Sequence, residues 1–493
     1  MPEIVDRQHR PILQRIARQM MIEHGFRPDF SPRIAAELDR IRGAAEESGA
    51  GIRDLTSLLW CSIDNDESLD LDQLTVAEAL PGGAVKAYVA VADVDALVDP
   101  RSAIDDHARF NTTSIYTPAA VFSMIPEKLS TGLTSLGFEE NRLAIVVEMS
   151  FGGDGSPAKS EVYRAKVRNR AKLAYNSVAA WLDKKAQPPG AVANVAGLDG
   201  NLLLQDRLAR TLKSRRHHQG ALSLETVQAR PVFDENLLKE LTFDTSNRAK
   251  DIIEDFMIAA NSAVVHFLAS RGSPSIRRVV RTPKDWGRIV ELAAERGASL
   301  PGEPDSAALE HFLANARAAD PLRFPDLSLS VIKLIGSGEY VAEAPGGASP
   351  GHFGLAVEDY THSTAPNRRY PDLTTQRLIK AAIEGRPAPI AGAALQVIAR
   401  NCTAMSGEAK KLERQIMKSA AALLLKPKIG RMFESIVTGA ADKGTWVRLL
   451  DYPVEGKLVR GFDGKKVGQR LRVKLVAANE ERGFIDFEAV RGG

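Results

Sequence analysis

The segment from Cys61 to Leu74 constrains this chain of 493 residues more than any other part of it. It contains five carboxylates within nine residues, namely Asp64, Asp66, Glu67, Asp70 and Asp72. Charges of one sign at this density repel one another unless something positive lies among them. The apolar run Leu58–Cys61 predicts a strand, so we expect the acids to emerge at a strand end. The alternative is a solvated acidic loop without a ligand.

Two of these acids are spaced so that they can act together. Asp70 and Asp72 lie two positions apart, and on extended backbone their side chains point to the same side. Asp64 precedes Asp70 by six residues and can fold back across a short loop. Grouped carboxylate oxygens suit Mg²⁺ or Mn²⁺, ions that serve phosphate chemistry. The segment therefore predicts a divalent-metal site.

The composition limits the class of protein. With 44% hydrophobic residues, a chain of this length can bury a large core and is expected to hold more than one domain. Its two cysteines, Cys61 and Cys402, are far apart and argue against a disulfide scaffold or a zinc site. No apolar run reaches the length of a membrane span, and the first residues are charged where a signal peptide is apolar. We expect a monomeric cytoplasmic protein with no membrane partner.

Charge is distributed unevenly along the chain, although the net charge is only +3. From Lys426 to the end there are 14 Lys and Arg residues against 9 Asp and Glu residues. From Lys457 to Lys474 there are seven basic residues and a single acid, Asp463. An acidic segment near the front and a basic tail indicate that a polyanion is held at one place and cut at another.

The first two regions of the chain differ in pattern. Residues 1–48 are expected to be helical, because Arg10–Met21 has apolar side chains at helical spacing and Ser31-Pro32 can start a second helix. These two helices could form a helix-turn-helix or could cap the next domain. Residues 49–425 mix strands and helices without βα alternation, which predicts an α+β fold. The expected strands and long helices are Ala84–Val94, Leu143–Phe151, Leu202–Arg216, Ser246–Ser270, Asp372–Glu384 and Gly392–Leu424.

The last region, residues 426–493, alternates short strands with turns. The expected strands are Met432–Thr438, Thr445–Leu450, Gly456–Val459, Arg470–Ala477 and Phe484–Glu488. Five such strands fit a small closed barrel of the oligonucleotide-binding (OB) type. A barrel of no particular function is the alternative, and the basic stretch favours RNA binding.

Further motifs follow the acidic segment in a fixed order. They are Val89–Val94, Arg109, Thr113–Pro118, Met124–Ser130, Leu133–Leu136, Glu254–Asn261 and Ala365–Leu373. Together, across residues 55–385, they closely resemble the RNB-type exoribonucleases, the ribonuclease II and ribonuclease R group. That family's metal signature spreads four aspartates over ten positions. Asp64, Asp70 and Asp72 fall on three of them, and Gln73 stands at the fourth.

The resemblance implies an RNB catalytic domain followed by an OB-fold RNA-binding domain. It implies a magnesium-dependent, processive 3′→5′ exoribonuclease that degrades single-stranded RNA to nucleoside 5′-monophosphates, with Mn²⁺ as a possible substitute. Asp70, Asp72 and Arg368 would be catalytic, and Asp64, Asp70, Asp72 and Gln73 would bind the metal. A guanidinium fork such as that of Arg368 matches phosphate oxygens. The alternative for this arginine is a structural ion pair.

The resemblance also implies RNA contacts. Tyr116 would stack on the 3′-terminal nucleotide and set the end product, although by itself it could be an ordinary core or surface tyrosine. Leu224 stands where the family commonly has a second aromatic, and since stacking contributes ~1–3 kcal/mol per base, the clamp should be looser. The remaining residues expected to contact RNA are Arg109, Arg369, Lys465, Lys466, Arg470 and Arg472. Ribonuclease II and R have two cold-shock-type barrels before the catalytic domain, and residues 1–48 do not match them.

Two other functions compete with this interpretation. An RNA-binding or regulatory protein with a weakened RNB fold is one, and Gln73 is the best argument for it. An aspartate-nucleophile phosphatase is the other. That chemistry requires Asp-x-Asp followed by Thr at a strand end, and Asp64-Asn65-Asp66-Glu67 lacks it.

Overall fold

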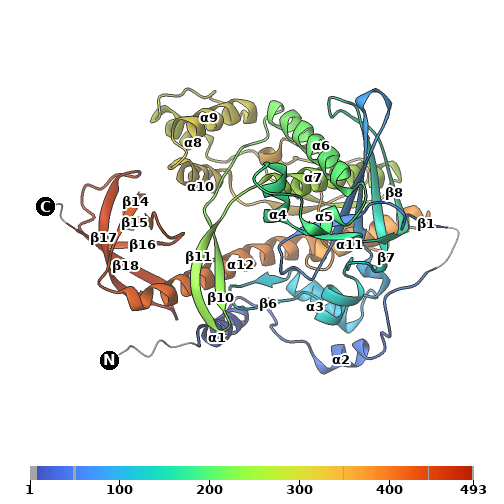
Figure 1. Cartoon of the computed structure of the whole chain (residues 1–493), viewed down its shortest axis with the longest axis horizontal. Coiled ribbons are helices and arrows are strands. Elements are labelled where there is room, and N and C mark those ends of the chain that lie inside the picture. The colour runs from blue at the N-terminus through green and yellow to red at the C-terminus, as the bar shows by residue number, and fades with distance from the viewer. Residues whose placement is uncertain (1–7, 48–50, 348, 442–443, 491–493) are drawn as a thin grey trace.

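The computed structural model describes residues 8–47, 51–347, 349–441 and 444–490. The chain forms a large domain around a mixed sheet, with a barrel at the other end of the molecule and two N-terminal helices along one side (Figure 1). The predicted boundary between residues 48 and 49 lies outside the described ranges. The α+β prediction is confirmed.

The large domain is built on a seven-stranded sheet with the order β1-β8-β7-β4-β3-β2-β9. Its central strands are antiparallel, whereas β1 and β9 pair in parallel with β8 and β2. The long strand pairs of this mixed sheet position the acidic loop, which connects β2 to β3. The strands are β1 (Ile52–Asp54), β2 (Cys61–Asp64), β3 (Gln73–Ala79), β4 (Val85–Ala92), β7 (Asn141–Phe151), β8 (Pro157–Arg168) and β9 (Ala171–Ala174).

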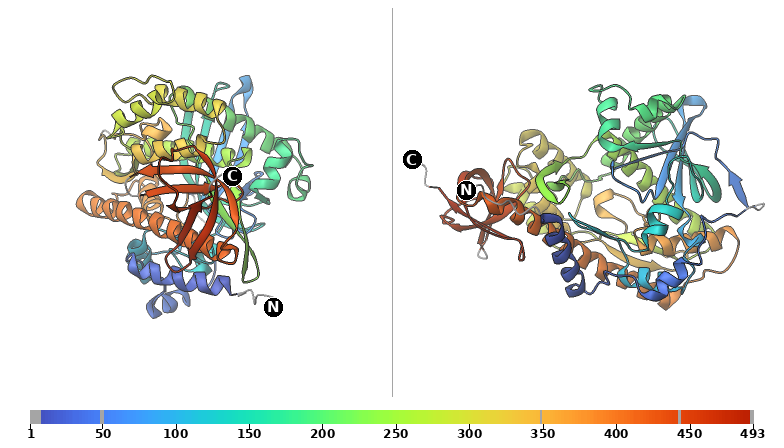
Figure 2. Two further views of the ribbon diagram at one scale, coloured as in Figure 1. Left: turned by 90° about the vertical axis from the view of Figure 1, so that its left-hand side faces the viewer. Right: turned by 60° about the horizontal axis from the view of Figure 1, so that its bottom comes forward.

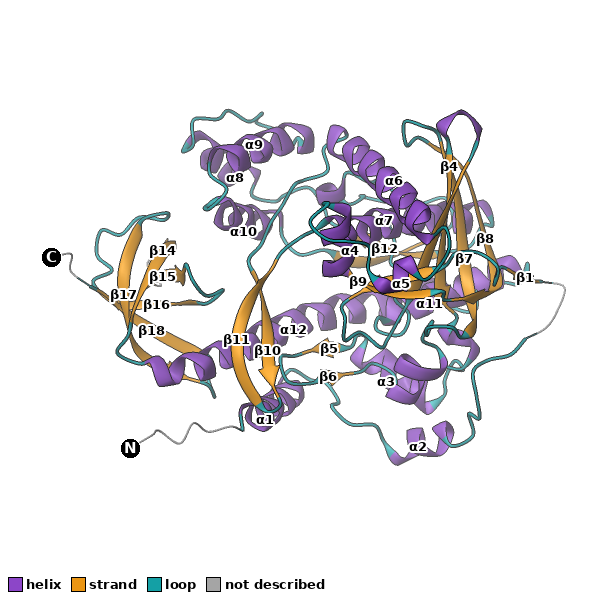
Figure 3. Cartoon of the chain, viewed as in Figure 1, coloured by secondary structure: helices purple, strands orange, loops and turns teal. Residues whose placement is uncertain are grey.

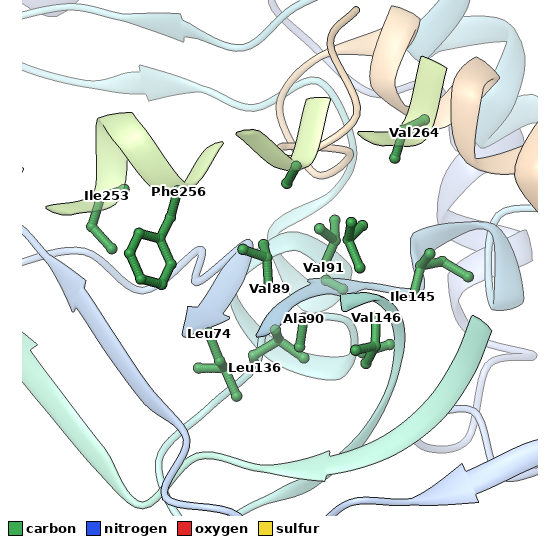
Figure 4. Packing of buried hydrophobic residues seen from close by; sticks show 14 of the residues in the cluster. Leu74, Val89, Ala90, Val91, Leu136, Ile145, Val146, Ile253, Phe256 and Val264 are labelled. Atoms are coloured by element: carbon green, nitrogen blue, oxygen red, sulfur yellow. The ribbon is translucent and has the colours of Figure 1, made fainter. Parts of the chain in front are cut away.

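Helix α7 (Arg248–Ser270) packs across this sheet and forms much of its core. The helix begins where the Asn247 side chain accepts a hydrogen bond from the Lys250 N–H at 3.0 Å, as N-cap residues do. Figure 4 shows Phe256 of α7 pointing toward the strands that contain Leu74 and Val89. Among the described residues, α7 is the one helix long and apolar enough to cross a membrane, and 61% of its apolar window is buried inside the fold.

Several shorter elements surround the sheet and contribute to the site. They are α3 (Ala103–Asn111), β5 (Ile115–Tyr116), β6 (Val121–Phe122), the π-helical turn η3 (Lys128–Leu133), α4 (Tyr175–Leu182), α5 (Gly190–Ala193) and α6 (Leu198–His218). Helix α5 lies in the Gly- and Pro-rich residues 188–197. The helix expected at residues 202–216 is confirmed and is longer at both ends.

A helical subdomain and a hairpin lie between the sheet and the barrel (Figure 3), and the sequence patterns did not predict them. Helices α8 (Trp286–Ala294), α9 (Ser306–Ala319) and α10 (Phe324–Ile335) enclose a small core of their own. The hairpin consists of β10 (Gln228–Asp234) and β11 (Leu237–Asp244). Strands β12 (Ser275–Val279) and β13 (Glu339–Glu343) pair on either side of the helical subdomain in sequence.

Helices α11 (Tyr370–Ile383) and α12 (Gly392–Leu425) agree with the predicted ranges to within two residues. Helix α12 runs along the molecule and leads into the barrel (Figure 2). Helix α1 (His9–Glu23) packs on α12, and the carboxylate of Glu37 in α2 (Pro32–Leu38) accepts hydrogen bonds from the first N–H groups of α3. Each N-terminal helix therefore packs on the large domain.

The C-terminal strands close into the predicted five-stranded barrel in the order β14-β15-β16-β18-β17. An ion pair between Arg448 and Asp326 of α10 joins barrel and helical subdomain at 2.9 Å, with both side chains largely buried. Beside this contact, the loop around Lys466 borders a cleft of about 990 Å³ against α9 and α10. The strands are β14 (Met432–Ala441), β15 (Gly444–Leu449), β16 (Glu455–Arg460), β17 (Arg470–Asn479) and β18 (Phe484–Ala489).

Candidate active site

The acidic loop connects two neighbouring strands of the main sheet. Strand β2 ends at Asp64 and β3 begins at Gln73, so Asp70 and Asp72 lie in the connection between them. The Asp72 carbonyl accepts a hydrogen bond from the N–H of Ala92 at 2.9 Å, which extends the pairing of β3 with β4. The acids emerge at a strand end, as predicted, although the strand is Cys61–Asp64 rather than Leu58–Cys61.

Asp72 is buried, and both oxygens of its carboxylate accept hydrogen bonds. Its carboxylate is 1% exposed, and Oδ2 accepts a hydrogen bond from Arg368 Nε at 2.9 Å. The other oxygen accepts the backbone N–H of Asn367 at 3.1 Å. Burial raises the pKa of the Asp72 carboxyl to about 7, while the Arg368 charge lowers it. Asp72 is therefore fixed against a guanidinium that lies 296 positions further along the chain.

Arg368 stands at the centre of the acidic cluster. Burial lowers its pKa, but the surrounding groups, with Asp72 first, hold it above its ordinary value. The other groups in that set are Tyr116, Asp64 and Asp70. The guanidinium thus supplies the positive charge that the density of carboxylates requires. Asp372, the next acid along the chain, pairs with Arg369 at 2.7 Å.

Tyr116 joins the cluster through Asp70. Its hydroxyl donates a hydrogen bond to Asp70 Oδ2 at 2.8 Å, and the residue is 40% exposed. Its backbone N–H donates to Glu413 Oε1 on α12 at 3.0 Å. Burial raises the pKa of the phenol, which therefore remains protonated at neutral pH. The ring is fixed beside the acids and still open to a ligand.

Asp64 and Tyr175 form the other edge of the cluster. Asp64 Oδ1 accepts hydrogen bonds from the Ser68 hydroxyl at 3.0 Å and from the Asn65 N–H at 2.7 Å. Burial raises the pKa of its carboxyl. Tyr175 follows β9, whose last residue pairs with Asp64. Burial, followed by the charge of Asp64, raises the pKa of Tyr175, so this tyrosine also lies beside the acids.

Gln73 is 7% exposed and pairs with Val91 of β4 at the start of β3. Within the ranges that the structure describes, its side-chain amide makes no hydrogen bond. The amide oxygen is therefore not committed to another group of the protein.

The donor atoms fit a hard divalent cation in chemistry, because they are carboxylate and amide oxygens. They are not gathered around a single point. No three Asp, Glu, His or Cys side chains of the described residues are close enough together to hold one ion. Asp72 is bonded to Arg368 and Asp70 to Tyr116. Ion binding would therefore exchange some of these contacts.

The other predicted RNA-binding residues of the large domain have partners outside the acidic cluster. Leu224 packs with the core of the α8–α10 subdomain, and Arg109 is exposed at the end of α3. In the described part of the chain, no hydrogen bond or ion pair joins either residue to the acidic cluster. Arg369 is committed to Asp372, but its charge still lowers the pKa of Asp72.

The predicted basic residues of the barrel face solvent. Lys466 and Arg470 are exposed, and Lys465 is partly buried. Arg472 is exposed and pairs with Glu434 at 2.9 Å. They belong to the barrel, at the other end of the molecule from the sheet (Figure 1).

Comparison with protein families identifies the class of protein. The RNB domain model matches residues 52–385, which is more than half of the chain. A second model, the RNase II-type exonuclease C-terminal S1 domain, matches residues 431–490. The chain therefore belongs to the RNB family, and the resemblance seen in its motifs is confirmed.

Individual relatives share much of this architecture. Ribonuclease R of Escherichia coli is 27% identical over 484 residues, covering 90% of this chain and 58% of the relative. The apo form of Mycoplasma genitalium RNase R matches with a TM-score of 0.84 and 23% identity, covering 97% of this chain and 78% of that one. Yeast Ssd1, described as a pseudonuclease, matches with a TM-score of 0.68 and 16% identity, covering 90% and 55%. The chain spans less than two thirds of the length of the Escherichia coli relative.

Three residues of the cluster escaped the sequence analysis. Asn367 donates its backbone N–H to Asp72, Glu413 on α12 accepts the backbone N–H of Tyr116, and Tyr175 is placed beside Asp64 by strand pairing. Asn367 lies in the motif Ala365–Leu373 but was given no role. No local pattern marks Glu413 or Tyr175, because each contact joins segments far apart in the chain. Alternation within β9 was the one signal that could have placed Tyr175 next to a strand end.

Proposed function

We propose that this protein is a divalent-metal-dependent 3′→5′ exoribonuclease that acts processively on single-stranded RNA and releases nucleoside 5′-monophosphates. The observation that carries the proposal is the buried Asp72 carboxylate, bonded to Arg368, with Asp64 and Asp70 around the same guanidinium. Acids and a cationic fork in one place suit phosphodiester hydrolysis. Membership of the RNB family and the similarity to ribonuclease R support the direction of the reaction.

Magnesium is the ion that we propose, with manganese as a substitute. Asp64 and Asp70 would hold it, with Asp72 and Gln73 as further ligands, because these side chains supply hard oxygen donors at the end of β2 and the start of β3. When bound, such an ion acidifies a water molecule and neutralises charge on the phosphate.

Arg368 would stabilise the charge that develops on the scissile phosphate. Its Nε is bonded to Asp72, yet the side chain is 40% exposed. The remaining N–H groups of the fork can therefore donate to phosphate oxygens. Asp72 would orient this guanidinium, and the exposed Tyr116 ring would stack on the terminal nucleotide.

The barrel would hold the part of the RNA that has not yet been degraded. Its exposed basic residues, among them Lys466 and Arg470, can neutralise backbone phosphates without reading sequence. Discrimination of RNA from DNA would rest on contacts to 2′-hydroxyl groups. We further propose a monomer in a reducing cytoplasm, because Cys61 and Cys402 are unpaired and buried.

A second candidate function is RNA binding or regulation without catalysis. Two observations favour it: the acids do not gather around one point, and Gln73 replaces a charged ligand. The similarity to yeast Ssd1, a pseudonuclease by its description, is in accord with this alternative. Both candidates bind RNA, so only hydrolysis separates them.

The decisive experiment uses single-stranded RNA labelled at the 5′ end or at the 3′ end, with Mg²⁺ or with EDTA. The proposal predicts that 3′ label is released at once as a mononucleotide, while 5′ label goes directly to a short limit product without a ladder of intermediates. EDTA should stop both. Binding of the RNA without release of any nucleotide, in Mg²⁺ and in Mn²⁺, would establish the non-catalytic alternative.

A matched pair of variants excludes contaminating nuclease. Asp72→Asn removes a charge that is buried and bonded, whereas Asp66→Asn removes a charge of the same loop that is exposed. The first variant should lose release of mononucleotides, and the second should retain it.

A further inference from the structure

Three consecutive buried residues, Thr134, Ser135 and Leu136, lie behind the candidate site. They are 4%, 2% and 1% exposed and follow the π-helical turn η3. None is a metal ligand, and none was given a role from the sequence. Their polar atoms form hydrogen bonds with the acidic loop and with the loop of Arg368, and Asn169 links them to strand β2.

Ser135 fixes the backbone on both sides of Asp70. Its hydroxyl donates a hydrogen bond to the carbonyl of Leu69 at 2.7 Å and accepts the N–H of Leu71 at 3.1 Å. The N–H of Leu136 donates to the carbonyl of Leu71 at 3.0 Å. Because Asp70 lies between these two leucines, its position in the loop follows from the Ser135 hydroxyl.

Thr134 is bonded to the loop that contains Arg368. Its hydroxyl lies 2.6 Å from Asn367 Oδ1 and 2.8 Å from the carbonyl of Leu129. Asn367 gives its backbone N–H to Asp72 and directly precedes Arg368. The threonine therefore connects η3 to the loop that presents the guanidinium.

Leu136 connects the same segment to the strand of Asp64. Its carbonyl accepts a hydrogen bond from Asn169 Nδ2 at 3.0 Å, and that amide also lies 3.1 Å from the hydroxyl of Ser62. Ser62 is in β2, two residues before Asp64. Asn169 is 1% exposed, so this link is also buried.

We propose that Thr134 and Ser135 are positioning residues that set the acidic loop and the arginine loop against each other. This inference rests on the proposed function. Both residues are buried, and their hydroxyls would act through Asn367 and through the neighbours of Asp70. Supporting hydrogen bonds of this kind typically change metal affinity or activity by about 10–100-fold when they are lost.

The chain offers an unusually close control for each variant. Ser135→Ala removes a buried hydroxyl with two hydrogen bonds. Five residues earlier, Ser130→Ala removes a buried hydroxyl that has no hydrogen-bond partner among the described residues. Thr134→Val is matched by Thr374→Val in α11, where the lost hydroxyl is buried and has no hydrogen-bond partner in the part of the chain that the structure describes. In each pair the change in size and polarity is the same, and only the bonding differs.

The readouts separate positioning from stability. Mn²⁺ affinity is measured without RNA, by electron paramagnetic resonance of the free ion. The single-turnover rate and the affinity for RNA in EDTA are measured beside it, and thermal unfolding gives the stability of every variant. We expect Ser135→Ala to weaken Mn²⁺ binding by about tenfold or more, and Thr134→Val to lower the single-turnover rate by a similar factor. The controls should retain both values, and RNA affinity in EDTA should be unchanged throughout.

The inference is overturned if each variant matches its control in Mn²⁺ affinity and in rate. If Ser135→Ala does not fold, Ser135→Cys keeps a weak donor of similar size and should give an intermediate loss; wild-type values in that variant would also overturn it. A wild-type protein that binds Mn²⁺ but releases no nucleotide would refute the proposed function alone. The comparison of Mn²⁺ affinities would then still decide the role of Ser135.

Discussion

The acidic cluster and the C-terminal barrel both concentrate charge, but they do so in opposite ways. In the cluster, Asp72 is 1% exposed and bonded to Arg368. In the barrel, Lys466 and Arg470 are exposed, and Arg472 pairs with Glu434, which is also exposed. Buried, paired charge is held in place and little screened by salt, whereas exposed charge is mobile and screened. The first arrangement suits chemistry at one phosphate, and the second suits attachment of a long polyanion.

The largest effect should come from Asp72→Asn. The amide keeps the shape of the side chain but removes the charge that orients Arg368 and would help to hold an ion. We expect hydrolysis to fall by about a hundredfold or more while single-stranded RNA still binds. Product release and filter binding measure the two quantities, with Asp66→Asn as the control. A variant that retains more than roughly a tenth of the wild-type rate would remove Asp72 from the reaction.

Arg368→Lys should have the next largest effect. Lysine keeps the positive charge among the acids but loses the planar fork. We expect the rate at saturating RNA to fall by about 10–100-fold with little change in affinity for RNA. The rate of Arg368→Ala should fall further. Steady-state kinetics give both parameters. If affinity collapses instead, Arg368 anchors the substrate and the contrast with the barrel disappears.

Gln73→Asp should have a smaller effect, in the favourable direction. An added carboxylate strengthens a hard-cation site, so the Mg²⁺ concentration for half-maximal rate should fall. A magnesium titration of wild type and variant measures this midpoint. Coincident curves, together with an upward shift in Asp66→Asn, would show that Asp66 rather than Gln73 completes the site.

Tyr116→Ala should change where degradation stops more than how fast it proceeds. The exposed ring is available for stacking, while its hydroxyl is bonded to Asp70. We therefore expect longer limit products for Tyr116→Ala and near wild-type lengths for Tyr116→Phe, which keeps the ring. Product ladders on a denaturing gel show the lengths. Identical ladders for all three proteins would exclude Tyr116 from the RNA site.

The smallest effect per residue is expected in the barrel. Replacing Lys465, Lys466, Arg470 and Arg472 by alanine should reduce the slope of log K against log salt concentration, for binding to long RNA, by about 0.7 for each lost phosphate contact. Lys184 and Lys185, exposed in the large domain, provide control substitutions. A variant with the full wild-type slope would show that the barrel is not the RNA anchor.

The sequence predicted the parts of this molecule that local patterns determine. Helix α12 and the five strands of the barrel follow from apolar periodicity and turn residues, and their ranges agree with the structure. The α8–α10 subdomain was missed although its helices have apolar residues at helical spacing and enclose a core of their own. The β10–β11 hairpin was missed because its buried residues Leu238 and Leu241 pack in the core of the barrel and α12, far away in the chain.

The site was predictable only in part for the same reason. The acids are neighbours in sequence and were recognised as a cluster. The contact between Asp72 and Arg368 joins residues 296 positions apart, and that between Ser135 and Leu71 joins residues 64 apart. Ser135 and Asn367 act through a hydroxyl and a backbone N–H that no composition rule distinguishes from ordinary core groups.

Single-turnover hydrolysis of 5′-labelled single-stranded RNA, with protein in saturating excess, tests the central claim most directly. Saturation removes differences in binding, so the rate reports only the chemistry. We expect the barrel variant with its four alanine substitutions to reach the wild-type rate, while the rate of Asp72→Asn should be lower by about a hundredfold or more. A barrel variant that is slow at saturation, or an Asp72→Asn protein that is as fast as wild type, would contradict the division of roles between the two regions.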